Sequence, residues 1–206
     1  MNGLIGKKVG MTRVFDEEGR HIPVTVIEAG PCVVAQVKTS ETDGYEAVQL
    51  GFGGRKTKNT TMPMQGHFRR AGVEPVRILR EVPPGEGDVP SPGETVDVSV
   101  FEGIDKVDVT GITKGRGFSG RIKRWNQHRG PDGHGSKNVR MSGSIGMHTK
   151  PGRVMKNTRM PGQYGNKRET KKNLTVVRID TERNLLLVKG SVPGSKNGIV
   201  FIRVSA

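Results

Sequence analysis

An internal segment, residues 111–172, holds too few apolar side chains to build a core of its own, and this limits the folds open to the chain. Only 12 of its 62 residues are apolar, and another 12 are glycine. Burial of apolar surface is what offsets the conformational entropy lost on folding. We therefore expect this segment to be irregular and to become ordered by packing against a partner.

The same segment carries the whole net charge of the protein. It holds 16 lysines and arginines against Asp132 and Glu169, which gives +14, equal to the net charge of the full chain. So dense a positive charge predicts a polyanionic partner, with nucleic acid first and an anionic membrane surface second. No stretch approaches the 18 apolar residues of a membrane-spanning helix, and the N-terminus lacks the apolar region of a signal peptide. We expect a protein that is neither secreted nor membrane-spanning.

Short β-like stretches lie on both sides of this segment, with turn residues between them. Many short strands separated by turns are typical of a barrel or sandwich. The predicted strands are 22–26, 32–37, 45–52, 96–100, 106–109, 174–179, 185–188 and 199–204. The single cysteine, Cys32, falls in one of them and is predicted to be a small core residue.

These patterns predict a mainly-β protein with a long, irregular basic extension. The β-barrel domain is expected to comprise 1–110 and 173–206, and the extension 111–172. An insertion at about 55–95 is expected to contain a short helix at 63–72, followed by a turn-rich loop at 83–93.

The glycines Gly115, Gly117 and Gly120 match the G-x-G-x-x-G pattern of dinucleotide-binding loops. That site also needs a following helix in a βαβ unit and an acidic residue about 20 positions later, and residues 135–142 contain no acid. A plain flexible turn is one alternative. We favour another, in which the glycines let the backbone approach phosphates closely. No cofactor is expected.

Basic side chains of the extension are the candidate contacts to a nucleic acid, because arginine can bind a phosphate through two hydrogen bonds. Trp125 is predicted either to stack on a base or to anchor the root of the extension to the barrel. The candidates in the extension are Lys114, Arg116, Arg121, Lys123, Arg124, Trp125, Arg129, His134, Lys137, Arg140, His148, Lys150, Arg153, Lys156, Arg159, Lys167 and Arg168, and a second cluster comprises Arg55, Lys56 and Lys58.

No catalytic or metal-binding constellation stands out in the sequence. The spacings among His128, His134 and His148 match no standard ligand pattern, and no thiol or carboxylate lies with them. We expect no metal, no small-molecule substrate and no enzymatic activity. Two other function classes stay open on the residues alone: a cofactor-using enzyme such as an RNA modifier, and a DNA-compacting protein.

Seven ordered blocks of the sequence resemble the bacterial large-subunit ribosomal protein L3 family over the whole length of the chain. They are GLIGKKVGMTRVF (3–15), IPVTVIEAGPC (22–32), DGYEAVQLGF (43–52), GHFRRAGVEP (66–75), VDVTGITKGRGFSGRIKRWN (107–126), SGSIGMHTKPGRV (142–154) and NLLLVKGSVPG (184–194). The resemblance implies a translation-protein β-barrel on the outer side of the subunit, in the cytoplasmic ribosome. It also implies direct binding to 23S-type rRNA, a role early in subunit assembly, and ribosomal proteins L14 and L19 as neighbours.

The resemblance further implies that the extension runs through rRNA toward the peptidyl transferase centre. Its tip would contain Gly146, Met147, His148 and Thr149. Many bacterial members have a glutamine, methylated on its side-chain amide, at the position of Met147. We therefore expect no such methylation in this chain. The sequence also ends at Ala206 without the lysine-rich tail of some relatives, so contacts made by that tail are not expected.

Overall fold

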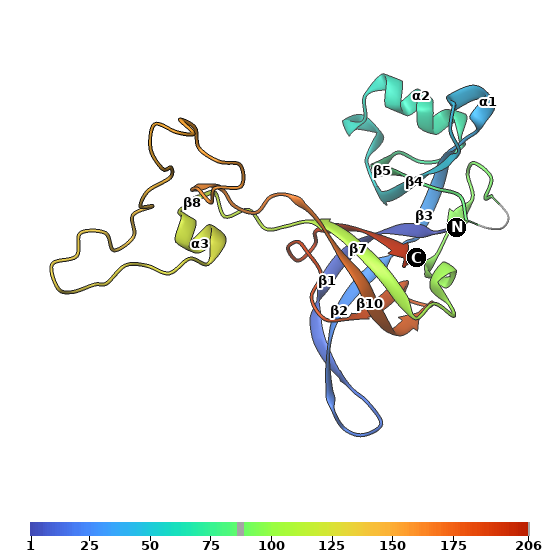
Figure 1. Ribbon diagram of the computed structural model, residues 1–206. Coiled ribbons are helices and arrows are strands. Elements are labelled where there is room, and N and C mark those ends of the chain that lie inside the picture. Colours follow the sequence, from blue (N-terminus) through green and yellow to red (C-terminus); the bar gives the residue numbers. More distant parts are fainter. Residues whose placement is uncertain (86–88, 206) are drawn as a thin grey trace. The chain divides into compact units, whose positions relative to one another are not determined.

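The computed structural model describes residues 1–85 and 89–205, and in this part of the chain strands far outnumber helices (Figure 1). The chain forms two compact units. The barrel unit comprises Met1–Thr113 and Arg168–Ala206, and the basic unit comprises Lys114–Lys167. The ends of the expected extension, 111–112 and 168–172, belong to strands of the barrel unit, because they pair with neighbouring strands.

Six antiparallel strands close into a barrel, which confirms the predicted mainly-β barrel class. In order around the barrel they are β1 (Gly3–Phe15), β12 (Ile199–Val204), β7 (Lys106–Ile112), β10 (Arg168–Asp180), β11 (Leu185–Lys189) and β2 (His21–Ala29). The first and last strands of the chain pair directly, with Gly3 opposite Arg203. A closed barrel leaves no open sheet edge, so the backbone groups of the strand segments that form its wall are paired within the barrel.

Strand β1 was not predicted, because its glycines weaken the strand pattern. The structure shows why glycine is needed there. A Cβ added at Gly3 would lie 2.6 Å from the Ile202 carbonyl oxygen, and one at Gly6 would lie 2.8 Å from the Glu28 carbonyl oxygen. These glycines allow close approach of β1 to its two neighbours in the barrel.

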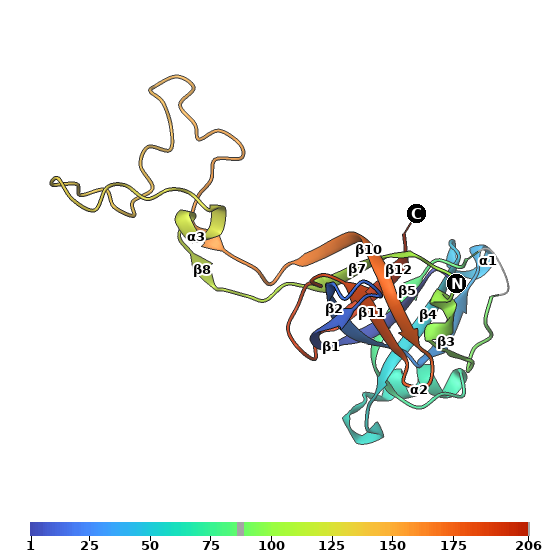
Figure 2. The same ribbon diagram turned by 90° about the horizontal axis from the view of Figure 1, so that it is seen from below.

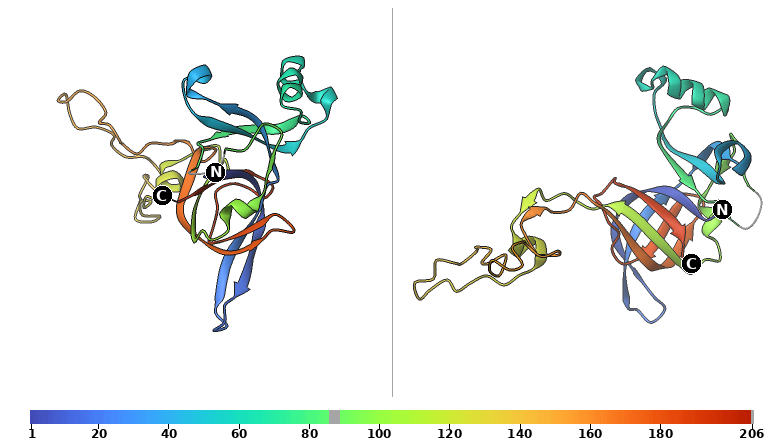
Figure 3. Two further views of the ribbon diagram at one scale, coloured as in Figure 1. Left: turned by 90° about the vertical axis from the view of Figure 1, so that its right-hand side faces the viewer. Right: turned by 45° about the horizontal axis from the view of Figure 1, so that its top comes forward.

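A second, four-stranded sheet is part of the barrel unit (Figure 3). Its order is β5 (Val76–Val82), β4 (Ala47–Gly54), β3 (Cys32–Lys38) and β6 (Thr95–Val96), and β5 was not predicted. The predicted strands 32–37 and 45–52 are confirmed as β3 and β4, but they lie in this sheet and not in the barrel. Gly30, with φ of +86°, turns the chain out of β2 toward β3.

One continuous core joins the two sheets. Cys32 is fully buried in it, as predicted, and its Sγ lies 3.4 Å from the carbonyl oxygen of Ile5 in β1. Burial raises the pKa of the Cys32 thiol to about 12, so the thiol stays protonated and unreactive at neutral pH.

Helical elements are short. In this part of the chain α1 (Ser40–Asp43) precedes the insertion, and η1 (Thr57–Asn59) and α2 (Met62–Arg70) lie in it. Helix α2 confirms the predicted helix, which stops before Gly72 with φ of +67°. The predicted turn-rich loop 83–93 includes residues 86–88, which lie outside the described residues.

The predicted strand at 96–100 is wrong beyond Val96. A short 3-10 helix, η2 (Val98–Phe101), follows β6 instead. Val98 and Phe101 are both fully buried, and their spacing of three residues places them on the same side of a 3-10 turn. The apolar alternation that indicated a strand therefore reflects a helical turn with two core residues.

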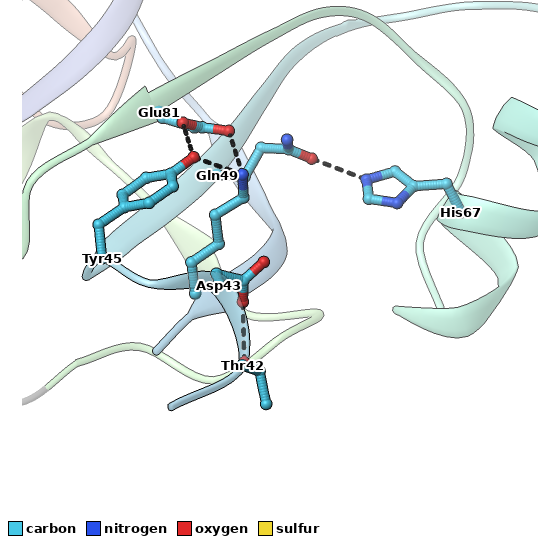
Figure 4. A network of polar contacts seen from close by, with 7 residues as sticks. Thr42, Asp43, Tyr45, Gln49, His67 and Glu81 are labelled. Atoms are coloured by element: carbon cyan, nitrogen blue, oxygen red, sulfur yellow. Dashed lines mark hydrogen bonds and ion pairs between the residues drawn. The ribbon is translucent and has the colours of Figure 1, made fainter. Parts of the chain in front are cut away.

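A polar network links the strands of the second sheet to each other and to α2 (Figure 4). Lys38 Nζ lies 2.8 Å from Glu81 Oε1 and donates to the Tyr45 hydroxyl at 2.6 Å, while that hydroxyl donates to Glu81 Oε2 at 2.9 Å. Gln49 Oε1 and His67 Nε2 lie 2.7 Å apart. The hydrogen bonds from Lys38 and then Tyr45 hold the pKa of Glu81 below its ordinary value.

This network predicts an acid-sensitive contribution to stability. Because the folded-state pKa of Glu81 is depressed, its contribution is present above the ordinary value of 4.5 and is lost as the pH falls below it. Glu81→Gln is expected to lower the thermal unfolding midpoint at pH 7 and to have a smaller effect at pH 3. Circular dichroism melts would measure both, with Glu41→Gln, on the exposed α1, as the control. A deficit of equal size at both pH values would contradict this role.

Candidate nucleic-acid interface

The basic unit has almost no core. Of residues 114–167, all of which the structure describes, only Ser119 is buried. Its elements are β8 (Phe118–Ser119), α3 (Arg121–Trp125) and β9 (Gly162–Gln163), and two irregular loops lie between α3 and β9 (Figure 2). Apolar side chains are bare, with Phe118 79% and Met147 76% exposed. The expected irregular conformation is therefore present.

Positive charge covers this unit. It contains 13 lysines and arginines and one acid, Asp132, so its net charge is +12 (13 − 1). Asp132 pairs with Arg129, so the unit's own acid neutralises one cation at most. Arg121 and Arg124 are half-buried, and the other candidates are exposed: Lys114, Arg116, Lys123, Arg129, His134, Lys137, Arg140, His148, Lys150, Arg153, Lys156, Arg159, Lys167, and Arg168 at the start of β10.

The glycine motif forms the base of the basic unit. The Arg116 N–H donates to the Tyr164 carbonyl at 2.8 Å, and the Tyr164 N–H donates to the Gly117 carbonyl at 2.9 Å. Gly117 and Gly165 both have positive φ, and a Cβ at Gly165 would overlap the Lys114 carbonyl. The glycines therefore let the outgoing and returning segments lie close together.

The surroundings of the motif differ from a dinucleotide site. Helix α3 has only five residues, and every strand pair among the named strands of the described chain is antiparallel. A dinucleotide loop belongs to a βαβ unit, in which the strands are parallel. The geometry thus favours a turn that presents backbone groups and basic side chains, and it does not resemble a cofactor-binding loop.

Two side chains of α3 clamp the returning segment. Arg124 Nη1 and Trp125 Nε1 each donate to the Met160 carbonyl oxygen at 2.9 Å. The Arg124 and Arg159 guanidinium carbons lie 5.1 and 6.0 Å from the centre of the Trp125 ring, within cation–π range. The anchoring contacts of Trp125 are therefore made inside the basic unit, and not to the barrel as one of the two predictions had it.

Residues opposite this clamp were missed by sequence reasoning. A Cβ at Gly162 would lie 2.5 Å from Arg124 Nη1, so this glycine makes room for the guanidinium. Tyr164 carries the Arg116 guanidinium over its ring at 5.4 Å. No local pattern marks Met160, Gly162 or Tyr164, because their partners lie roughly 35–50 residues earlier in the chain.

The predicted tip is a fully exposed turn. Gly146, Met147, His148 and Thr149 are all exposed. Local hydrogen bonds hold its shape: Ser144 Oγ donates to the Gly146 carbonyl at 2.7 Å, and Thr149 Oγ1 lies 2.9 Å from His148 Nδ1. The tip thus presents a flexible thioether and an imidazole outward.

The second cluster lies in the insertion of the barrel unit. Arg55, Lys56 and Lys58 are exposed around η1, and α2 ends with the exposed Arg69 and Arg70. The two lysines of β1 do not add to this cluster, because each makes a contact within the barrel unit. Lys7 pairs with Glu28 at 3.3 Å, and Lys8 Nζ donates to the Val192 carbonyl at 2.7 Å.

Within residues 1–85 and 89–205, no group of three or more histidine, cysteine or acidic side chains could hold a metal ion. Across the same ranges, no helix is long and apolar enough to cross a membrane.

Known proteins match the chain along its whole length. The family model for ribosomal protein L3 matches residues 93–185. A "Large ribosomal subunit protein uL3" from Thermotoga petrophila is 55% identical over 203 residues, covering 98% of this chain and 97% of that protein. Proteins of the same name from Herpetosiphon aurantiacus and Syntrophobacter fumaroxidans are 53% and 51% identical, each with 97% of its length covered.

Proposed function

Because the chain belongs to the ribosomal protein L3 family, of structural and non-enzymatic constituents of the large ribosomal subunit, we propose that it binds 23S-type rRNA directly through its basic unit. The observation that carries the proposal is the charge of +12 on a unit with one buried residue. Such a unit lacks internal contacts, and folded RNA supplies both the anions and the packing surface that it needs.

The interaction follows from the side chains present. Exposed arginines and lysines of the two loops contact phosphates and neutralise repulsion between neighbouring rRNA helices. Phosphate and 2′-hydroxyl contacts outnumber contacts to base edges, so the shape of the RNA is recognised more than its sequence. The barrel docks by shape and through Arg55, Lys56 and Lys58.

The wider proposal concerns the place of the protein in the subunit. The protein binds rRNA early and helps to nucleate assembly, and its tip at Gly146–Thr149 reaches toward the peptidyl transferase centre. Ribosomal proteins L14 and L19 are its neighbours. The likeness of the sequence blocks to the L3 family supports these statements, and the exposed, turn-shaped tip is compatible with insertion between RNA helices.

Deleting residues 126–160 tests this function. A short Gly-Ser linker in their place removes seven of the 13 cations of the basic unit and lies beyond the barrel strands. We expect a folded barrel by circular dichroism, a slope of log affinity against log salt smaller by up to about 6, and accumulation of immature subunits.

A full-length variant with the same seven cations changed to glutamine is the matched control, because it loses charge and keeps the loops. Unchanged rRNA affinity in both variants would refute the proposal. A collapsed barrel after the deletion would show that the core extends into the loops. Release of the unaltered protein from large subunits by a mild salt wash would also argue against direct binding.

Gly162→Ala tests whether the clamp at α3 prepares the basic unit for RNA. The added Cβ would displace the Arg124 guanidinium and break its hydrogen bond to Met160. The loss of one such bond, about 0.5–1.5 kcal/mol, predicts rRNA binding weaker by up to roughly tenfold, with an unchanged unfolding midpoint. Filter binding would measure it.

Gly133→Ala is the control for this substitution, because a Cβ there meets nothing within 4 Å. Equal losses of affinity in both variants would assign the effect to general stiffening of the backbone. They would show that the clamp has no specific role in rRNA binding.

A further inference from the structure

The outer part of the β1–β2 hairpin, residues 9–22, projects from the barrel as an unpartnered ribbon (Figures 1 and 3). Strand β1 pairs with β12 only as far as Lys7, and β2 pairs with β11 only from Val24 onward. The cross-strand pairs Val14–Ile22 and Phe15–His21 therefore have no third strand beside them, whereas the Pro23 carbonyl still accepts a hydrogen bond from the Gly190 N–H at 2.8 Å. Two-stranded ribbons alone are marginally stable in water, so additional contacts are needed to hold this one.

One face of the ribbon carries two exposed apolar side chains, Met11 and Phe15, on either side of Arg13. Side chains alternate between faces along a strand, so Met11, Arg13 and Phe15 share a face with Pro23 and His21 opposite them. Met11 is 54% and Phe15 58% exposed. The rings of Phe15 and His21 have their centres 4.6 Å apart, which makes a small aromatic platform.

The turn at the end of the ribbon is rigid and anionic. Asp16 accepts hydrogen bonds from the Arg20 N–H at 2.7 Å and from Arg20 Nε at 2.8 Å, and Arg20 Nη1 lies 2.9 Å from Glu18. Among the described residues Glu17 makes no ion pair. Three acids and one arginine give residues 16–20 a net charge of −2, in a chain of net charge +14.

We propose that this ribbon is a docking surface for a neighbouring basic protein of the large subunit. Met11 and Phe15 pack on that protein, and Glu17 faces a lysine or arginine. A protein embedded in rRNA must itself be basic, so its surface complements the anionic turn, whereas rRNA phosphates repel that turn. Exposed apolar side chains gathered on one face, as Met11 and Phe15 are, are a feature of protein–protein contact sites. This surface lies outside the basic unit, and the inference does not depend on how that unit binds rRNA.

A photo-crosslinker tests the proposal in assembled subunits. We would replace Phe15 by p-benzoyl-phenylalanine and, in separate variants, Met147 and Met62, which is 78% exposed on α2. The expected result is a crosslink from position 15 to a basic large-subunit protein and from position 147 to rRNA. An rRNA crosslink at position 15, or none there while position 147 reacts, overturns the proposal. A protein crosslink at 15 without an rRNA crosslink at 147 counts against the proposed function alone.

The charge of Glu17 gives a second readout with opposite signs for the two kinds of partner. Glu17→Lys in the position-15 crosslinker background is expected to lower the yield by about threefold or more, and Glu17→Gln to lower it less. Glu17 makes no hydrogen bond in the described turn, so the unfolding midpoint should not change. A yield that rises with lysine would indicate a polyanionic partner, and an unchanged yield would remove the charge complementarity; either result overturns the proposal.

Discussion

Raising the salt concentration from about 50 to 200 mM is expected to weaken binding of the protein to a large-subunit rRNA fragment by roughly 10³–10⁵-fold. This range corresponds to about 6–10 phosphate contacts, and the basic unit offers 13 lysines and arginines with one acid among them. Each contact releases counterions from the RNA, so the effect accumulates with the number of contacts. A filter-binding titration over four or five salt concentrations would give the slope.

Substituting three exposed cations in the loop that precedes β9 tests which residues produce that slope. Changing Arg153, Lys156 and Arg159 to glutamine should reduce it by about 3, because each phosphate contact contributes about 0.9. The same changes at the barrel residues Arg178, Arg183 and Lys189 should leave the slope nearly unchanged. A near-flat slope for the unaltered protein would refute phosphate binding by the extension, and equal affinity for duplex DNA would favour the DNA-compacting alternative.

Phe101→Ala is expected to destabilise the barrel unit by about 3–5 kcal/mol, a large part of the 5–15 kcal/mol typical of a folded domain. The ring is fully buried in the core shared by the two sheets, at the end of the short helix η2. Its removal costs the transfer free energy of the ring and leaves a cavity. Urea unfolding followed by far-ultraviolet circular dichroism would measure the change.

Phe118→Ala provides the matched control, because the same ring in the basic unit is 79% exposed. We expect its free energy of unfolding to stay within about 0.5 kcal/mol of the unaltered protein. A loss below about 1 kcal/mol for Phe101→Ala would mean that the two sheets unfold independently and do not share one cooperative core.

The parts of the fold that were predictable depend on local pattern. Apolar alternation predicted β2, a short continuous apolar run predicted β11, and a glycine stop predicted the end of α2. Strand β1 was not predicted because the reason for its glycines, close approach to carbonyl groups of two other strands, is visible only in the fold. The partition of β3 and β4 into a separate sheet depends on pairings between distant residues, which no local pattern contains.

The candidate interface divides in the same way. A count of charge along the chain is enough to locate the basic unit and its cations. The clamp between α3 and Met160 joins residues 35 and 36 positions apart, and the space that Gly162 provides has meaning only once Arg124 lies opposite it. Composition reveals the chemistry of the interface, and only the fold reveals how its loops are held.

The last strand of the chain closes the barrel, and this sets an order of events during synthesis. Strand β12 lies between β1 and β7, so until residues 199–204 have been made the other five strands form an open sheet with two bare edges. Chains emerge from the N-terminus onward. The basic segment 114–167 is therefore complete and free to meet RNA before the barrel that carries it can close. Nascent protein that stops before residue 199 should bind rRNA while its barrel remains open to proteases.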